Sequence, residues 1–320
     1  MHLLRRNPPL IVTFSLIFSS LFAVNSLPTS TTSPIQTYFQ HPLHLTHDAN
    51  TRILLATDIF LGKPYSLDSM GDSEHDLFDP RPIIQTEGFD CMTLVTTVLG
   101  LIESHNFEDF PHTLSLVRYG HEKPAYFNRH HFISHEWNPS NTRLGFLEDK
   151  TPHIIDESGS PLAKVHTGVV DYPNWLLYQK KYLSRNAPLQ PQQQKIWQET
   201  FARSHKSLSV ITYIPFSAFF YPNGEPNHYI INQIPSGSII EFVTPDWDLT
   251  DKIGTHLDVM HLGFVVTKGS HTERFFRHAK LGASVVEVPL IDYLRFMINH
   301  IPQAKGIHIE AVQLTHSKKP

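Results

Sequence analysis

The 320-residue sequence has little of several features that define other protein classes. It contains a single cysteine, Cys91, so an intrachain disulfide is excluded. The formal net charge of −4 argues against non-specific binding of nucleic acid. After residue 26 no apolar run is long enough to span a bilayer. Histidine, by contrast, is abundant: the chain has 22, so surface charge should depend on pH.

The first 26 residues have the pattern of a secretory signal peptide. Arg5 and Arg6 supply positive charge, residues 10–24 carry no charge, and Ser26 follows as a small residue at a cleavage point. An uncleaved N-terminal anchor is the alternative, although the run is short for a membrane span. We expect an exported protein, periplasmic or secreted, with no stable membrane span after processing. A lone thiol in such a protein is flagged as reactive.

The cysteine lies in the stretch EGFDCMTLV, residues 87–95. Gly88 permits a turn and Asp90 is a good N-cap, so Cys91 is predicted to lie in the first turn of a helix. The apolar residues that follow have the spacing of one helical face: Leu94, Val95, Val98, Leu99 and Ile102. At a helix N-terminus the free N–H groups would stabilise a thiolate. A buried cysteine that packs as a small hydrophobe is the alternative.

A cysteine hydrolase also needs a base and a group that orients the base. His261 begins an apolar strand close to the small Gly263, and His278 lies on the next predicted strand across a hairpin. Because cross-strand neighbours can touch, His278 is a candidate to orient His261. A structural role for both histidines is the alternative.

The order of the predicted elements indicates an α+β fold with an antiparallel sheet packed on the cysteine helix. Residues 27–45 are read as a loosely packed N-terminal arm, and residues 46–320 as one domain with insertions near 107–165 and 172–207. Gly62 is predicted to end a helix capped by Thr46 or Asp48. Strands are predicted at 165–169, 209–214, 238–243, 261–266, 274–279, 285–288 and 307–314. Residues 113–117 fit either a strand or the end of a helix. Residues 126–137 are predicted to form the wall of a cleft. Helices are predicted within residues 172–207 and 291–298.

Four motifs occur in a specific order: GKPY at 62–65, FDC at 89–91, DVMHLG at 258–263 and FRHA at 276–279. In that order they resemble the NlpC-type papain-like cell-wall hydrolases. Within these the chain is most similar to the bacterial N-acetylmuramoyl-L-alanine amidase-like branch, which has a segment similar to residues 129–132. The similarity spans about residues 50–314. It implies a papain-like fold in which an antiparallel sheet packs against the cysteine helix.

The resemblance also implies roles for particular residues. Cys91 would be the nucleophile, with its N–H in an oxyanion hole, His261 the general base and His278 the third member. Tyr65 matches a tyrosine that lines the site. Two further residues would line the substrate cleft, although a structural role is equally open: Arg129 and His131. No cofactor and no metal are implied.

Two positions depart from the patterns of these families. General NlpC-type enzymes have Ser-Gly after the cysteine, where this chain has Met92 and Thr93. That difference favours the amidase-like branch. Members of the branch usually have an acidic residue at the position of Thr96. The resemblance therefore implies no role for Thr96 in place of that acidic residue.

The implied reaction is acyl transfer through a thioester, cleaving the amide between N-acetylmuramic acid and L-alanine in peptidoglycan or muropeptides. One alternative is an endopeptidase that cuts the stem peptide, for example between D-glutamate and diaminopimelate. Another is a non-catalytic wall-binding or effector protein. A third is a metal site at His131 and His135, whose spacing of four fits one helical face, although no Glu follows His131 as in zinc peptidases.

Overall fold

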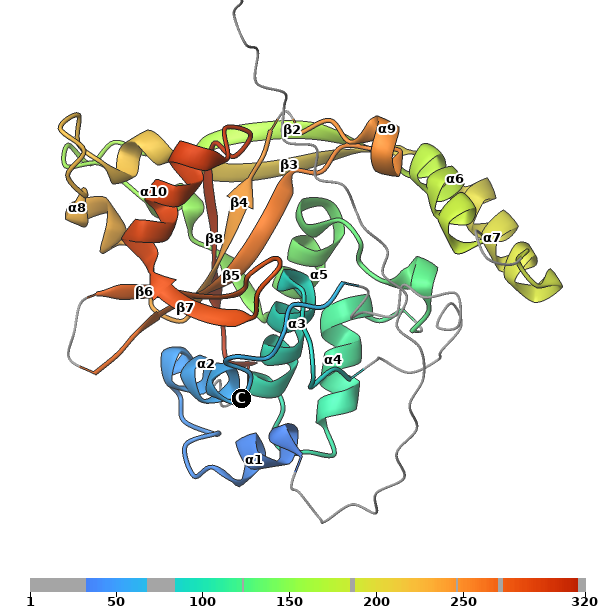
Figure 1. The fold of residues 1–320 in the computed structure, drawn as a ribbon, viewed down its shortest axis with the longest axis horizontal. Helices are drawn as coiled ribbons and strands as arrows, with labels where there is room; N and C mark the ends of the chain where they lie inside the picture. The colour runs from blue at the N-terminus through green and yellow to red at the C-terminus, as the bar shows by residue number, and fades with distance from the viewer. Residues whose placement is uncertain are drawn as a thin grey trace, which may run out of the picture. The chain divides into compact units, whose positions relative to one another are not determined.

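The computed structural model describes residues 33–67, 84–122, 124–184, 188–245, 247–269 and 273–315 (Figure 1). The predicted signal peptide, residues 1–26, lies outside them. The chain from Ser33 onward forms one compact unit. Among the helices of these ranges, none combines the length and apolar character needed to cross a membrane.

An eight-stranded sheet runs through this unit in the order β2-β3-β8-β4-β5-β6-β7, with β1 paired to β8. All pairings between these strands are antiparallel, which confirms the predicted sheet type. Each predicted strand is present, and β1 is additional. The strands are β1 Leu147–Asp149, β2 Lys164–Asp171, β3 Lys206–Pro215, β4 Ser238–Val243, β5 Val259–Thr267, β6 Arg274–Ala279, β7 Val285–Pro289 and β8 Gly306–Val312.

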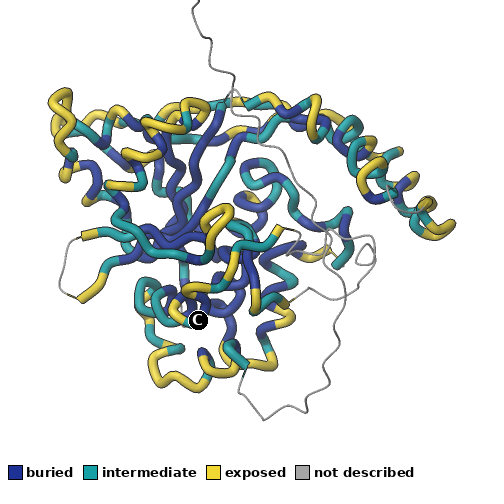
Figure 2. Tube along the Cα trace, viewed as in Figure 1, coloured by how far each residue is buried: buried dark blue, intermediate teal, exposed yellow. Residues whose placement is uncertain are grey.

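Helices cover both faces of the central strands. On one face α2 (Ala49–Asp58), α3 (Cys91–Ile102) and α4 (Phe110–Tyr119) enclose an apolar core with Leu262 and Phe264 of β5. On the other face α10 (Leu290–His300) and α8 (His228–Ile231) enclose a second core with Phe242 and Phe276. The central strands are accordingly buried along most of their length (Figure 2). Residues 113–117, which fit a strand or a helix end, belong to α4.

The N-terminal segment differs from the loose arm expected for residues 27–45. Residues of that segment form helix α1 (Pro34–Gln40), and its Ile35 and Tyr38 are buried in the core around α3. Their burial shows that local composition rich in Pro, Ser and Thr was overridden by two apolar side chains that find a partner surface.

Most of the remaining helical segments, except η4 (Phe216–Phe219) and α9 (Thr250–Ile253), lie in the regions expected to be insertions. The predicted helical stretch 172–207 contains α6 (Tyr172–Leu183) and α7 (Pro191–Arg203). Other short segments are η1 (Tyr126–Asn128), the π-helix η2 (Ile133–Trp137), α5 (Asn138–Arg143) and η3 (Thr151–His153).

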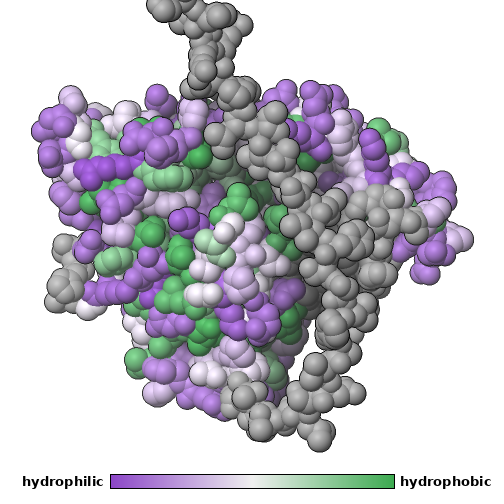
Figure 3. All heavy atoms as spheres, in the orientation of Figure 1, coloured by the Kyte–Doolittle hydropathy of each residue, from purple (hydrophilic) through white to green (hydrophobic). Residues whose placement is uncertain are grey.

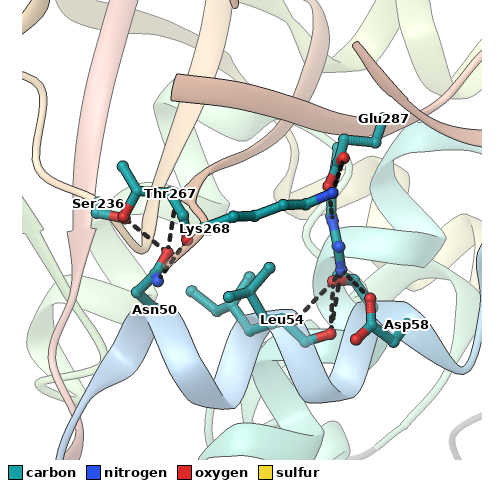
Figure 4. Close-up of polar contacts among 10 residues, drawn as sticks. Asn50, Leu54, Asp58, Ser236, Thr267, Lys268 and Glu287 are labelled. Carbon is teal, nitrogen blue, oxygen red and sulfur yellow. Dashed lines mark hydrogen bonds and ion pairs between the residues drawn. The ribbon is translucent and has the colours of Figure 1, made fainter. Parts of the chain in front are cut away.

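Polar contacts fix α2 to the sheet next to the site described below (Figure 4). Arg277 of β6 is buried, and its Nη1 donates to the carbonyl of Leu54 at 3.1 Å and pairs with Asp58 at 2.7 Å. Its Nε donates to Glu287 of β7 at 2.7 Å. Because buried charges need such partners, Arg277 ties β6, β7 and α2 together immediately before His278.

Candidate active site

Helix α3 begins at Cys91, as its sequence predicts. The Asp90 carboxylate caps the helix by accepting from the main-chain N of Thr93 at 2.6 Å. Cys91 is half-buried, and three main-chain groups, those of Leu262, Met92 and Cys91 itself, act to lower the pKa of its thiol. Two of these groups are free N–H groups of the first helical turn. The third comes from strand β5, so the sulfur lies where the helix meets the sheet.

The electrostatics of the thiol differ from the sequence-based expectation of a thiolate. Burial raises the pKa of the Cys91 thiol to about 12, and the nearby Asp90 carboxylate raises it further. The main-chain hydrogen bonds lower the pKa but are outweighed by these two effects. The resting group is therefore a neutral thiol, because the loss of hydration destabilises the thiolate more than the N–H groups of the helix terminus stabilise it.

Strands β5 and β6 separate close to the sulfur. Their pairing ends at Phe264 and Arg277, after which β5 continues beside β4 and β6 continues beside β7. His261 and His278 lie on these two separated ends. Leu262, the residue after His261, lies outside the paired register of β5 and β6, and its main chain is among the groups that lower the pKa of the Cys91 thiol.

The two histidines form a direct pair. Nε2 of His261 lies 2.8 Å from Nδ1 of His278, and the rings stand nearly perpendicular at 83°. Burial, followed by the charge of His278, lowers the pKa of His261 to about 3. Burial, followed by Lys280, lowers the pKa of His278 to about 4. Both rings are neutral at ordinary pH, and Nδ1 of His261 is the nitrogen left for proton exchange with another group.

Tyr293 of α10 covers the histidine pair, and the sequence analysis did not identify it. Its ring centroid lies 4.7 Å from that of His278 and 6.1 Å from that of His261. Burial and then the proximity of Cys91 raise the pKa of its hydroxyl. The helical spacing of residues 291–298 predicts a helix, and Tyr293 falls beside its buried stripe rather than within it. That spacing alone does not indicate that Tyr293 lies next to the histidines.

Tyr65 lies near the start of helix α3. Its main-chain N donates to the carbonyl of Ala283 at 2.9 Å, and Tyr65 forms a bridge with Phe89, two residues before Cys91. Burial and then Cys91 raise the pKa of the Tyr65 hydroxyl. Tyr65 therefore lies close enough to Cys91 to be affected by its charge, while His261 and His278 contact each other.

Arg129 and His131 line a cavity of about 220 Å³ that adjoins this site. Met92, which follows Cys91, and Asp258, which precedes His261 by three residues, line the same cavity. Arg129 is 4% exposed, and Nε2 of His131 contacts the carbonyl of Tyr126 at 2.7 Å. Burial holds the pKa of His131 well below its usual value. Both residues thus line the same cavity as Met92, the residue that follows Cys91.

Asp258 is a second functional candidate that the sequence analysis quoted in a motif without assigning a role. Its Oδ2 accepts from Ser134 at 2.7 Å and from Ser209 at 2.5 Å, and its Oδ1 lies 3.3 Å from Nε2 of His166. A Cβ at Gly168 would lie 2.6 Å from Oδ1, so β2 needs a glycine there. These partners hold a buried carboxylate at the wall of the cavity.

The two histidines considered as metal ligands do not share a helical face. His131 lies outside any helix, whereas His135 belongs to the π-helix η2. Within the part of the chain that the structure describes, no group of three or more His, Cys, Asp or Glu side chains is arranged to hold a metal ion.

Solved structures resemble this fold over most of its length. Protein LPG0564 from Legionella pneumophila str. Philadelphia 1 is 36% identical with a TM-score of 0.76, over 87% of this chain and 93% of that one. An N-acetylmuramoyl-L-alanine amidase from Bacteroides uniformis ATCC 8492 is 21% identical with a TM-score of 0.56, over 83% of this chain and 99% of that one. The second likeness is one of fold alone. No curated protein matches the chain.

A family model also matches the chain across the site. The AmiA-like family, described as N-acetylmuramoyl-L-alanine amidase-like, matches residues 55–298. That span contains Tyr65, Cys91, His261 and His278, and it covers more than half of the 320 residues. The chain therefore belongs to the AmiA-like family.

Proposed function

We propose that this chain is an exported cysteine hydrolase that cleaves the amide between N-acetylmuramic acid and L-alanine in peptidoglycan or muropeptides. The observation that supports the proposal is the direct pair of His261 and His278, whose Nε2 and Nδ1 lie 2.8 Å apart, on the strands next to Leu262, whose main chain is among the groups that lower the pKa of the Cys91 thiol. The family description and the name of the Bacteroides neighbour support the choice of bond. The motif order supports an NlpC-type papain-like fold, and the first 26 residues support export.

The reaction begins from the neutral thiol. As the Cys91 sulfur attacks the lactyl carbonyl carbon, its proton passes to His261, and a tetrahedral oxyanion forms. The main-chain N–H of Cys91, at the start of α3, faces the developing negative charge. Because Nδ1 of the neutral His261 ring takes the proton, its Nε2–H donates to Nδ1 of His278, which accepts and so fixes the ring.

The intermediate then collapses by breaking the carbon–nitrogen bond. His261 gives its proton to the departing amine of L-alanine, leaving a thioester on Cys91. His261 next accepts a proton from water as the water attacks the thioester carbon. Cleavage of the carbon–sulfur bond restores the thiol with that proton. The products are a muramyl carboxylic acid and a peptide with a free N-terminal alanine.

The test is to incubate residues 27–320 with peptidoglycan fragments and to identify products by mass spectrometry, with Cys91→Ala as the control. We expect intact peptides that begin with L-alanine, together with peptide-free glycan, and no product from the variant. Peptides cut after D-glutamate would instead identify a stem-peptide endopeptidase that uses the same residues. No cleavage of either bond would refute the proposal and leave a non-catalytic wall-binding or effector protein.

A further inference from the structure

Helix α10 carries three rings in a row on one side of its buried stripe. The buried stripe consists of Leu290, Leu294 and Met297. Beside it, the ring centroid of Phe296 lies 5.9 Å from that of Tyr293 and 5.0 Å from that of His300. We call these three residues, Tyr293, Phe296 and His300, the α10 ring row.

The α10 ring row starts at the candidate catalytic pair and leads away from it toward solvent. Tyr293 packs on His278 and His261, with centroids 4.7 and 6.1 Å away. Phe296 is 47% exposed and His300 is also exposed. A large aromatic ring left half in water at the rim of a reactive site is typical of a contact surface for a ligand.

The chemistry of the α10 ring row differs from that of the cavity lined by Arg129, Met92 and Asp258. The cavity contains the buried guanidinium of Arg129 and the buried carboxylate of Asp258, which suit charged groups. The ring row presents aromatic faces and edges without a carboxylate or guanidinium among its three members. Aromatic faces pack well on the C–H faces of pyranose rings, which are apolar although the sugar rim is polar.

We propose that the α10 ring row is the subsite for the sugar part of the substrate, with Phe296 as its main stacking residue. The inference rests on the proposed function, because the acyl half of that substrate is a muramyl sugar and the leaving half is a peptide. The sugars would extend along α10 from Tyr293, and the charged peptide would occupy the Arg129 cavity. Apolar side chains also reach the surface elsewhere on the molecule (Figure 3), so continuity with the histidine pair is what singles out this row.

Binding of a peptide-free sugar tests the subsite without relying on catalysis. The probe is the disaccharide N-acetylglucosaminyl-N-acetylmuramic acid, titrated into the Cys91→Ala protein and followed by calorimetry. We expect Phe296→Ala to weaken binding at least about tenfold, the scale of one lost aromatic stack. Phe296→Trp keeps an aromatic face and should retain binding. Tyr229→Ala removes a comparably exposed ring (44%) on α8 and serves as the matched control.

Kinetics on two substrates separate failure of this inference from failure of the proposed function. We expect the unsubstituted protein to prefer the disaccharide peptide to the muramyl peptide in kcat/KM, and Phe296→Ala to reduce that preference. Hydrolysis that proceeds with an unchanged preference, or disaccharide binding as tight in Phe296→Ala as in Tyr229→Ala, would overturn the subsite while the activity stands. Disaccharide binding that requires Phe296 in a protein without amidase activity would keep the subsite and refute the function. Equal melting temperatures of the Phe296 variants show that folding is unaffected.

Discussion

Nε2 of His261 and Nδ1 of His278 lie 2.8 Å apart, so each imidazole fixes the tautomer and orientation of the other. We predict that His278→Ala lowers kcat about 10- to 100-fold with little change in KM, the usual loss when the partner that orients a functional imidazole is removed. His278→Asn keeps a hydrogen-bonding group and should lose less. His261→Ala removes the proposed base and should lower kcat about 10²- to 10⁴-fold. Steady-state kinetics on a muramyl peptide measure all three.

The neutral state of the thiol and its base leads to a prediction about chemical reactivity. Because the pKa of Cys91 is raised to about 12 and that of His261 is lowered to about 3, the thiolate–imidazolium pair is a minor species. We predict that the rate of alkylation by iodoacetamide, measured without substrate, rises continuously from about pH 6 to about pH 10 as thiolate forms. A rate that is already at its plateau near about pH 5 would show a preformed ion pair and contradict this assignment.

Asp90 has two separable effects on α3. Its carboxylate caps the helix through the 2.6 Å bond to Thr93, and its charge raises the pKa of the Cys91 thiol. We predict that Asp90→Ala lowers the free energy of unfolding by about 1 kcal/mol and at the same time speeds alkylation of Cys91. Asp48→Ala is the matched control, because Asp48 caps α2 by the same kind of bond, 2.9 Å to the main-chain N of Thr51. It should lose similar stability without a change in alkylation rate.

Local patterns in the sequence predict most of the secondary structure. The cap at Asp90 and the period of α3 depend on neighbours a few residues away, and both occur as expected. The alternation at 165–169 correctly predicts strand β2, although its apolar Val165 and Val169 are exposed. The burial of Ile35 and Tyr38 in α1 depends on the distant core and has no local signal. The same is true of the π-helix η2, where Glu136 accepts from the main-chain N of His131 and Phe132.

The residues of the candidate site also fall into two groups: those that a local sequence motif predicts, and those that only the fold brings to the site. Cys91, His261 and Tyr65 could be proposed from motifs because each motif is a short stretch of sequence. Tyr293 and the partners of Asp258 could not, since α10, η2 and β3 reach the site only through the fold. The sign of the thiol pKa shift was predicted wrongly because the sequence shows the helix terminus but not how deeply the sulfur is desolvated.

A buried group of ionisable side chains lies on the face of the sheet that carries α3, on β4 and β8. Nε2 of His308 lies 3.0 Å from Oε1 of Glu310, and both residues are buried. Burial lowers the pKa of His308, but the hydrogen bond to Glu310 and the charge of Glu241 outweigh it and raise that pKa to about 9. Burial raises the pKa of Glu241 to about 7. His308 is therefore protonated in the folded protein at neutral pH.

This group predicts how stability depends on pH. The folded pKa of His308 is higher than the unfolded value of 6.5, so its stabilisation is complete below about pH 6.5 and is lost as pH rises through about 9. Over that window the free energy of unfolding should fall by on the order of 3 kcal/mol, as measured by urea unfolding. Glu241, with a folded pKa of about 7, loses most of its proton by about pH 8, so the slope between about pH 8 and about pH 9 belongs to His308. His308→Gln should flatten the profile, whereas the exposed His153→Gln should keep it, and equal slopes in both variants would refute the assignment.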